Sequence, residues 1–231
     1  MRKLLPVILL FLVFGCLGVQ KVEVVYYCTS EHPYCKIVDK YLDEIKFLSI
    51  DYCNVRDFNN CSKNAKDFAG YIYVLPTLVV ENKSFSGLFG FMDFLDYLKS
   101  KGYKVYKPTL KEIVNDIEEV VKTYNKTEER DEFLRYLVEF KNNISDKNRI
   151  YFFYSPTCPH CVEVKPYVES LANKTTVVFC DITKFQNCSG DAKIVVTLSG
   201  LKGVPTAVIV NLTQVKVLIG SKEVKNLKKF I

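Results

Sequence analysis

The sequence predicts an α/β fold made of two tandem units, each a mixed β-sheet flanked by helices. Apolar β-type runs alternate with segments whose apolar residues recur at helical spacing, which is typical of this fold class. The order of these segments also occurs twice, since residues 21–27 align without gaps with 147–153, and 53–62 with 180–189. Matched prolines and cysteines in one order indicate a duplication.

The N-terminus has the pattern of an export signal. A short positive start, Met1-Arg2-Lys3, precedes an uncharged apolar run over residues 4–19. That run is short for a membrane span of about 20 residues but suits a signal peptide. It contains Gly15-Cys16, which resembles a lipoprotein lipobox with cleavage before Cys16 and lipid on its sulfur. An uncleaved anchor and ordinary cleavage are the alternatives, and all three place the rest of the chain outside the cytosol. We expect a tether to the cell membrane, with membrane contact through residues 1–20 only.

The first unit is expected over residues 21–104. Residues 22–27 form an apolar run too continuous to alternate in and out, which indicates a strand buried on both faces. Gly102 is expected to end the last helix as its C-cap. The remaining expected elements are a helix over 34–47, a strand over 48–52, a short helix over 64–69, strands over 77–81 and 84–87, and a helix over 91–98.

Residues 105–146 are expected to form a helical inter-unit region. Apolar residues lie at helical spacing over 110–124, behind Pro108-Thr109, and again over 128–141. Because each helix has an apolar stripe, both should pack on a neighbouring surface, and we assign both to the second unit as its N-terminal extension.

The second unit, residues 147–231, repeats the order of the first. We expect strands over 149–154, 175–180, 207–210 and 215–219, and helices over 159–171 and 190–198. A last helix should begin near Ser221, because serine is a favourable N-cap.

A Cys-Pro-His-Cys motif, residues 158–161, directly follows the strand over 149–154 and opens a helix. A thiol at a helix N-terminus feels the positive end of the helix dipole, and the thiolate is the form that attacks disulfides. We therefore expect Cys158 to be the nucleophile, His160 to add positive charge beside it, and Cys161 to resolve the mixed disulfide. A structural disulfide or half of a zinc site uses the same spacing. With two histidines and no second ligand pair, no metal and no cofactor are expected.

Downstream lies Gly203-Val204-Pro205-Thr206, followed by an apolar run. The motif, the strand, the helix and this Val-Pro-Thr together resemble the thioredoxin superfamily, in which a cis-proline loop faces the redox cysteines. The resemblance implies that Pro205 is cis and that Val204, Pro205 and Thr206 bind the substrate backbone. Pro76 is expected to be cis at the equivalent position. Thr157 stands where thioredoxins often have tryptophan.

The Cys-Pro-His-Cys form is similar to that of bacterial periplasmic disulfide oxidases. Two fused units resemble the protein disulfide oxidoreductases and, more distantly, the protein disulfide isomerases.

The first unit departs from this pattern. His32 stands at the position of Cys158, and Cys35 at that of Cys161. Cys28 lies at the strand end instead, so Cys28 and Cys35 could form a secondary redox couple or a structural disulfide.

The other cysteines suggest structural bridges. Setting Cys16 apart from the nine cysteines leaves an even set that divides into local pairs. The pairs Cys53/Cys61 and Cys180/Cys188 occupy matching places in the two units, where short disulfides would stiffen a loop. The alternative is an electron relay to Cys158.

The net charge of +6 is spread over scattered lysines, which excludes the clustered basic stripe of a nucleic-acid-binding protein. The expected function is an extracytoplasmic thiol–disulfide oxidoreductase, an oxidase or isomerase whose partners are cysteine-containing polypeptides. Two alternatives stay open. One is a non-catalytic binding module with structural disulfides, and the other is a reductase that relays electrons from a membrane redox partner to one dedicated client.

Overall fold

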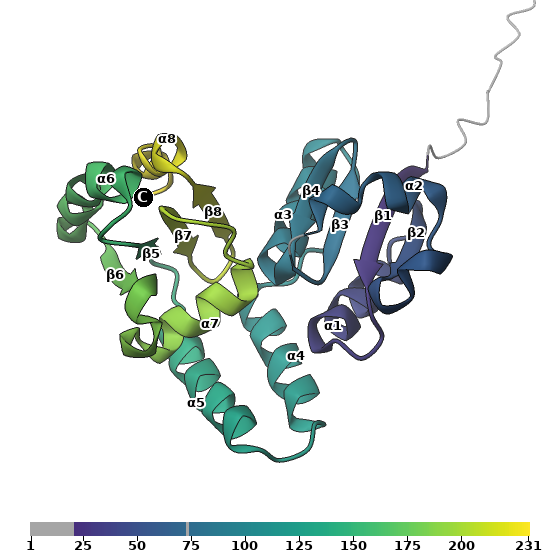
Figure 1. The fold of residues 1–231 in the computed structure, drawn as a ribbon, viewed down its shortest axis with the longest axis horizontal. Helices are drawn as coiled ribbons and strands as arrows, with labels where there is room; N and C mark the ends of the chain where they lie inside the picture. The colour runs from purple at the N-terminus through teal and green to yellow at the C-terminus, as the bar shows by residue number, and fades with distance from the viewer. Residues whose placement is uncertain (1–20, 73) are drawn as a thin grey trace, which may run out of the picture.

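The computed structural model describes residues 21–72 and 74–231, so the predicted signal segment and Cys16 lie outside it. It contains two four-stranded mixed sheets, with strand orders β2-β1-β3-β4 and β6-β5-β7-β8. Helices flank both sheets (Figure 1). The predicted α/β fold with two similar units is confirmed.

The first sheet is built around a central buried strand. β1 pairs in parallel with β2 and antiparallel with β3, and β3 pairs antiparallel with β4. The elements of this unit are β1 (Val22–Cys28), α1 (Pro33–Leu42), β2 (Leu48–Asn54), α2 (Lys63–Asp67), β3 (Thr77–Val80), β4 (Lys83–Ser86) and α3 (Gly87–Ser100).

The second sheet repeats these pairings strand for strand. Its elements are β5 (Arg149–Tyr154), α6 (Pro159–Ser170), β6 (Thr176–Asp181), α7 (Gly190–Ser199), β7 (Thr206–Val210), β8 (Val215–Ile219) and α8 (Ser221–Val224). In both units a 3₁₀ helix follows the second strand, Val55–Asn60 in the first and Ile182–Asn187 in the second. The repeated sequence is therefore a repeated topology.

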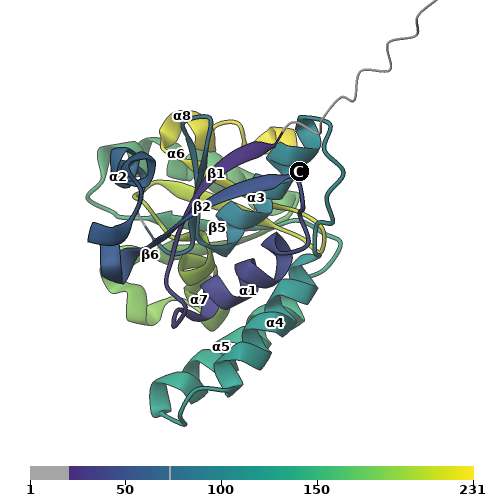
Figure 2. The same ribbon diagram turned by 90° about the vertical axis from the view of Figure 1, so that its right-hand side faces the viewer.

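The inter-unit helices α4 (Leu110–Lys122) and α5 (Glu128–Asn143) form a hairpin that extends beyond the sheets (Figure 1, Figure 2). They pack on different units. α4 lies on α1, where the Tyr41 hydroxyl donates to Asp116 at 2.6 Å. α5 lies on the second unit, with the ring of Phe140 6.3 Å from that of Tyr151. The assignment of both helices to the second unit is right for α5 and wrong for α4, because their apolar stripes face different partners.

One apolar core runs through both units. It joins side chains of β1, α1 and α3 to side chains of α5, α7 and β7. The contact between units is made by α3, which packs on α7 and β8. Burial of this shared surface fixes how the two sheets sit relative to one another.

The helix boundaries that differ most from the predictions are the end of α1 and the start of α3. α1 ends at Leu42 rather than at residue 47, because the chain turns there and Ile45 folds back into the core. α3 begins at Gly87 rather than at residue 91. A Cβ on Gly90 would lie 2.7 Å from the backbone carbon of Phe85. Close packing thus explains a glycine inside a helix that propensity alone disfavours.

The structure confirms one of the two predicted helix caps and not the other. Gly102 follows α3 with a φ of +88°, and the N–H of Tyr103 donates to the carbonyl of Leu98 at 3.1 Å, so the predicted C-cap is confirmed. A helix does begin at Ser221, as predicted, but the predicted N-cap is wrong. Gly220 is the N-cap of α8, with a φ of +85°, and Ser221 is already helical.

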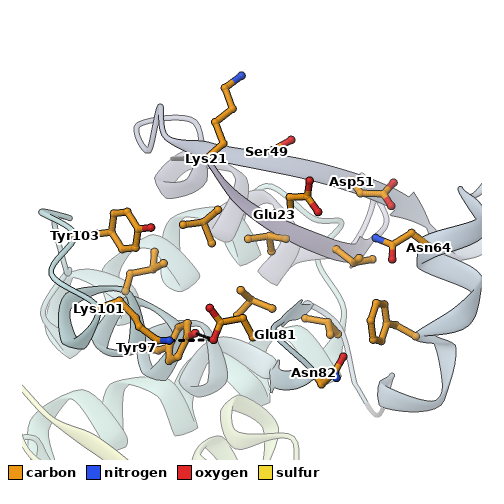
Figure 3. A pocket seen from close by; sticks show the side chains of 17 residues that line it. Lys21, Glu23, Ser49, Asp51, Asn64, Glu81, Asn82, Tyr97, Lys101 and Tyr103 are labelled. Carbon is orange, nitrogen blue, oxygen red and sulfur yellow. Dashed lines mark hydrogen bonds and ion pairs between the residues drawn. The ribbon is translucent and has the colours of Figure 1, made fainter. Parts of the chain in front are cut away.

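A hollow of about 750 Å³ lies on the face of the first sheet that carries α2 (Figure 3). Charged and polar side chains line its mouth, including Glu23, Asp51 and the hydrogen-bonded pair Glu81 and Tyr97. On the matching face of the second sheet, α5 and α7 cover the strands. The hollow includes no residue of the Cys-Pro-His-Cys motif.

Among the helices of residues 21–72 and 74–231, none combines the length and apolar character needed to cross a bilayer.

Asp93 on α3 lies where the first unit meets β8. Burial raises the pKa of Asp93 from 3.8 to about 6, against the opposing charges of Lys216 and Lys107. Because the pKa of Asp93 is higher in the folded state, the folded protein binds this proton more tightly than the unfolded chain does. The stability that the proton adds is fully present below pH 3.8 and is lost as the pH rises through 6.

We expect Asp93→Asn to stabilise the protein at pH 8, by up to about 2 kcal/mol once partial exposure is allowed for. At pH 3.5 the two proteins should have nearly the same stability, because Asp93 is then largely protonated in both states. Thermal unfolding of both proteins at the two pH values measures this difference. An equal change at both pH values would contradict the prediction.

Candidate active site

The redox motif lies at the carboxyl end of β5. Cys158 is the N-cap of α6, with Pro159 at its first position, where a missing N–H costs nothing. The turn before it was not anticipated from the sequence. The Cys158 N–H donates to the Ser155 carbonyl at 3.1 Å, and the hydroxyls of Ser155 and Thr157 lie 2.9 Å apart. A Ser-x-Thr directly after a strand is a turn signal that could have predicted this support.

The two thiols of the motif have different environments. Cys158 is half-buried, whereas Cys161 is fully buried on α6. A hydrogen bond with the Cys161 thiol lowers the pKa of Cys158, and the backbone N–H groups of Cys161 and His160 lower it further. Burial raises the pKa of Cys161 to about 11, and the bond with Cys158 adds to that rise. One accessible thiol is thus prepared to ionise while its neighbour stays protonated.

The backbone of His160 contributes to the site, and its ring is exposed. Its imidazole side chain is 73% exposed, and Nδ1 lies 3.9 Å from Glu163. The N–H of His160 is the part of this residue that lowers the pKa of Cys158. The expected ring charge beside the thiol stays a prediction.

The Val204–Pro205 peptide bond is cis. It lies beside the motif, with the Sγ of Cys158 3.8 Å from the Val204 carbonyl oxygen. The Pro205 carbonyl accepts a hydrogen bond from the Gly220 N–H at 2.8 Å, and the buried Thr206 hydroxyl donates to Gly203 at 2.6 Å. The fold therefore brings Val204, Pro205 and the motif together.

The first unit has the same backbone with different chemistry. His32 is the N-cap of α1, with φ −77° and ψ 125°, close to the −81° and 116° of Cys158 at α6. Leu75–Pro76 is cis, as Val204–Pro205 is. Cys35 forms a disulfide with Cys28, and both residues are fully buried. Burial lowers the pKa of His32. This unit thus presents no accessible thiol at its helix N-terminus, and a buried disulfide favours the structural interpretation of that pair.

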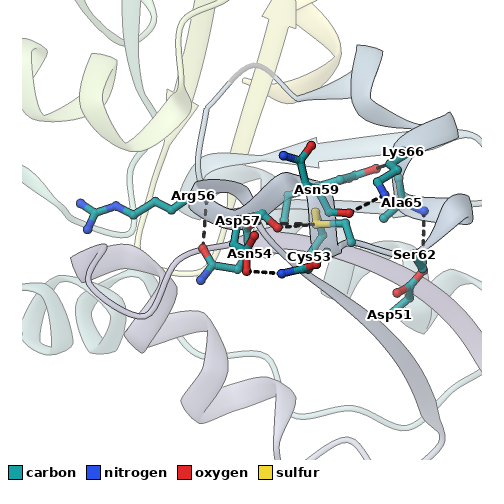
Figure 4. Close-up of a disulfide and its surroundings, with 12 residues drawn as sticks. Asp51, Cys53, Asn54, Arg56, Asp57, Asn59, Ser62, Ala65 and Lys66 are labelled. Carbon is teal, nitrogen blue, oxygen red and sulfur yellow. Dashed lines mark hydrogen bonds between the residues drawn. A yellow bond between two sulfur atoms is a disulfide. The ribbon is translucent and has the colours of Figure 1, made fainter.

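The loop disulfides Cys53–Cys61 and Cys180–Cys188 are formed, with Cα atoms 5.0 Å and 5.2 Å apart. Figure 4 shows the first of them inside a turn whose backbone is held by Asn54 and Ser62 side chains. Both bridges are buried. Each links the end of the second strand to the start of the following helix, as a loop-stiffening bridge should.

Removing the second bridge by Cys180→Ala/Cys188→Ala should cost about 2–3 kcal/mol of unfolding free energy, because the unfolded chain gains loop entropy. Thiol–disulfide exchange by the folded protein should be unchanged. Urea unfolding and an exchange assay measure the two effects, and Cys53→Ala/Cys61→Ala is the matched control. Lost exchange with unchanged stability would instead favour an electron relay.

Within residues 21–72 and 74–231, no group of three or more His, Cys, Asp or Glu side chains is arranged to hold a metal ion.

Comparison with known proteins finds a family model that matches the second unit. The thioredoxin family model matches residues 133–231. No curated protein matches the chain. Among solved structures, a mutant thioredoxin from Halobacterium salinarum is 29% identical, covering 38% of this chain and 73% of its own, with a TM-score of 0.30.

Mitochondrial thioredoxin 3 from Saccharomyces cerevisiae is 22% identical, covering 40% of this chain and 85% of its own, with a TM-score of 0.32. A mutant alkylhydroperoxide reductase protein from Enterococcus faecalis is 15% identical, covering 91% of this chain and 89% of its own, with a TM-score of 0.27. Residues 133–231 thus match the thioredoxin family model and have a thioredoxin-like α/β fold, and the first unit repeats the same sheet order.

Proposed function

We propose that this protein is an extracytoplasmic thiol–disulfide oxidoreductase that acts on protein cysteines through Cys158 and Cys161, as an oxidase or an isomerase. One observation supports it most. The half-buried Cys158 has a lowered pKa, its buried neighbour Cys161 has a raised pKa of about 11, and a cis-proline backbone lies beside them. This is the arrangement that disulfide exchange needs.

Oxidation of a client proceeds in two exchanges. A client thiolate attacks the Cys158 sulfur of the Cys158–Cys161 disulfide, and Cys161 leaves as a thiolate that takes up a proton because its pKa is high. A second client thiolate then attacks the client sulfur of the mixed disulfide. Cys158 leaves, and its lowered pKa makes it a good leaving group. The client loses two electrons, the cysteine pair gains them, and a partner disulfide reoxidises the pair by the same exchange.

Isomerisation uses the reduced pair. The Cys158 thiolate attacks a client disulfide, and a different client thiol displaces it, so no net electrons are transferred. In both reactions an extended client segment would pair with the backbone at Val204, whose carbonyl lies 3.8 Å from the Cys158 sulfur. That pairing would bring the client cysteine to the accessible sulfur.

The proposed location rests on the export-type N-terminus and on the three disulfides of the described residues, which persist in oxidising compartments. We propose a lipid tether at Cys16. Cys16→Ser should move the protein from the membrane fraction to the soluble fraction. Retention of Cys16→Ser in the membrane fraction would favour an uncleaved anchor.

The function is tested with the full chain on two substrates, a reduced unfolded polypeptide and a polypeptide with scrambled disulfides. The double variant Cys158→Ala/Cys161→Ala should lose all activity. The matched double variant Cys28→Ala/Cys35→Ala removes the other unit's pair and should keep it. A wild-type protein that binds polypeptides but exchanges no disulfide would contradict the proposal and favour a binding module.

A further inference from the structure

The cis-proline loop of the first unit touches the segment that leads to the cis-proline of the second. Val74, two residues before Pro76, lies over Gly200, which ends α7. A Cβ on Gly200 would come within 2.5 Å of Val74 Cγ2. Real Cβ atoms do not approach other atoms so closely, so this contact requires glycine.

A second glycine, Gly87 of the first unit, packs closely at the same contact. A Cβ on Gly87, the first residue of α3, would lie 2.8 Å from the Leu198 carbonyl oxygen. Gly87 and Gly200 have φ values of +73° and +58°, which L side chains rarely adopt. The Gly87 N–H donates to the Pro76 carbonyl at 2.7 Å, which ties the contact to the first cis-proline.

On the other side of this contact, residues 201–204 connect Gly200 to Pro205. Leu201 and Val204 are partly buried against the shared core. The far end of the segment is held by the hydrogen bond from Gly220 to Pro205. The segment that carries Val204 therefore has two anchors, and the first unit supplies one of them.

The two cis-proline loops differ in the residue that lies two positions before the proline. Val74 aligns with Gly203, and a Cβ on Gly203 would meet nothing within 4 Å. The second unit's loop is thus open beside Cys158, whereas the first unit's loop is covered by the end of α7. A covered loop is unavailable to a client.

We propose that Val74 and Gly87 are positioning residues that hold residues 201–204, so that the Val204 backbone presents a client polypeptide to Cys158. This inference rests on the proposed function. The first unit then supports the reaction through packing. Its own cis-proline loop contacts the neighbouring loop instead of a substrate.

The test substitution is Gly200→Ala, which places a methyl group against Val74. Displacing the loop should raise KM for a polypeptide substrate by about 10- to 100-fold, since small misplacements of a bound substrate have effects of this size. Alkylation of reduced Cys158 by iodoacetamide should stay within about twofold of wild type, because the thiolate depends on α6.

Two variants control for a merely structural effect. In Val74→Ala/Gly200→Ala the methyl group of residue 200 takes the place of the Val74 methyl groups, so the contact is kept without the collision and KM should return toward wild type. Gly102→Ala introduces a side chain at a φ of +88° with nothing within 4 Å, so it adds backbone strain without the contact. It should lower the melting temperature and leave KM unchanged.

An unchanged KM in Gly200→Ala, or an equal loss of Cys158 alkylation, would overturn the inference. So would a double variant no better than Gly200→Ala alone. The proposed function fails differently, since it would be contradicted by a wild-type protein that exchanges no polypeptide disulfide.

Discussion

Cys161→Ser is expected to turn the protein into a covalent trap for its clients. In this variant Cys158 still has a half-buried sulfur at the N-terminus of α6, so it can attack a client disulfide. The buried thiol that would resolve the product is gone, and serine cannot attack a disulfide. The mixed disulfide should therefore accumulate toward one client per protein, where wild type shows none at steady state.

Non-reducing electrophoresis after an acid quench measures the trapped complex. Cys158→Ser is the matched control and should form no complex, because it lacks the attacking sulfur. Complexes formed equally by both variants would mean that another cysteine reacts, and would contradict the assignment of Cys158 as the nucleophile.

Alkylation of the reduced protein should distinguish the two thiols strongly. At pH 8 a thiol with a pKa of about 11 is roughly one part in a thousand thiolate, whereas one with a pKa below 9.0 exceeds about a tenth. Cys158 should therefore react about 100-fold faster than Cys161, and burial of Cys161 widens the ratio. The Cys158 rate should fall as the pH is lowered through its pKa, which lies below 9.0.

Mass spectrometry of iodoacetamide-treated protein, digested after timed quenching, gives both rates. The disulfide-bonded cysteines Cys53 and Cys180 serve as internal controls that should stay unmodified after mild reduction. Equal rates at residues 158 and 161, or a Cys158 rate that rises only above pH 9, would contradict the lowered pKa.

The sequence was informative where the chain repeats. The strands of both sheets follow from buried apolar runs such as 149–154, since few other structures bury such runs on both faces. The two cis prolines follow from the resemblance of the Val-Pro-Thr segment, and both are present. The sequence alignment of the two units matches His32 with Cys158, and the structure places both residues at helix N-caps.

What could not be predicted depends on contacts between distant segments. Gly87 and Gly90 lie in a helix because of what touches them, and no local pattern records that contact. α4 and α5 have similar apolar stripes, so sequence alone could not assign them to different units. The turn before Cys158 depends on hydrogen bonds made by Ser155 and Thr157, and no local pattern had assigned either residue to that support.

The shared core predicts how the two units unfold. Because apolar side chains of α3 and α7 belong to one buried cluster, separating the units would expose both surfaces to water. The two sheets should then melt together in a single cooperative transition. The first unit, which presents no reactive thiol, therefore supports the fold of the second unit. A gene fragment encoding the second unit alone would encode an incomplete folding unit.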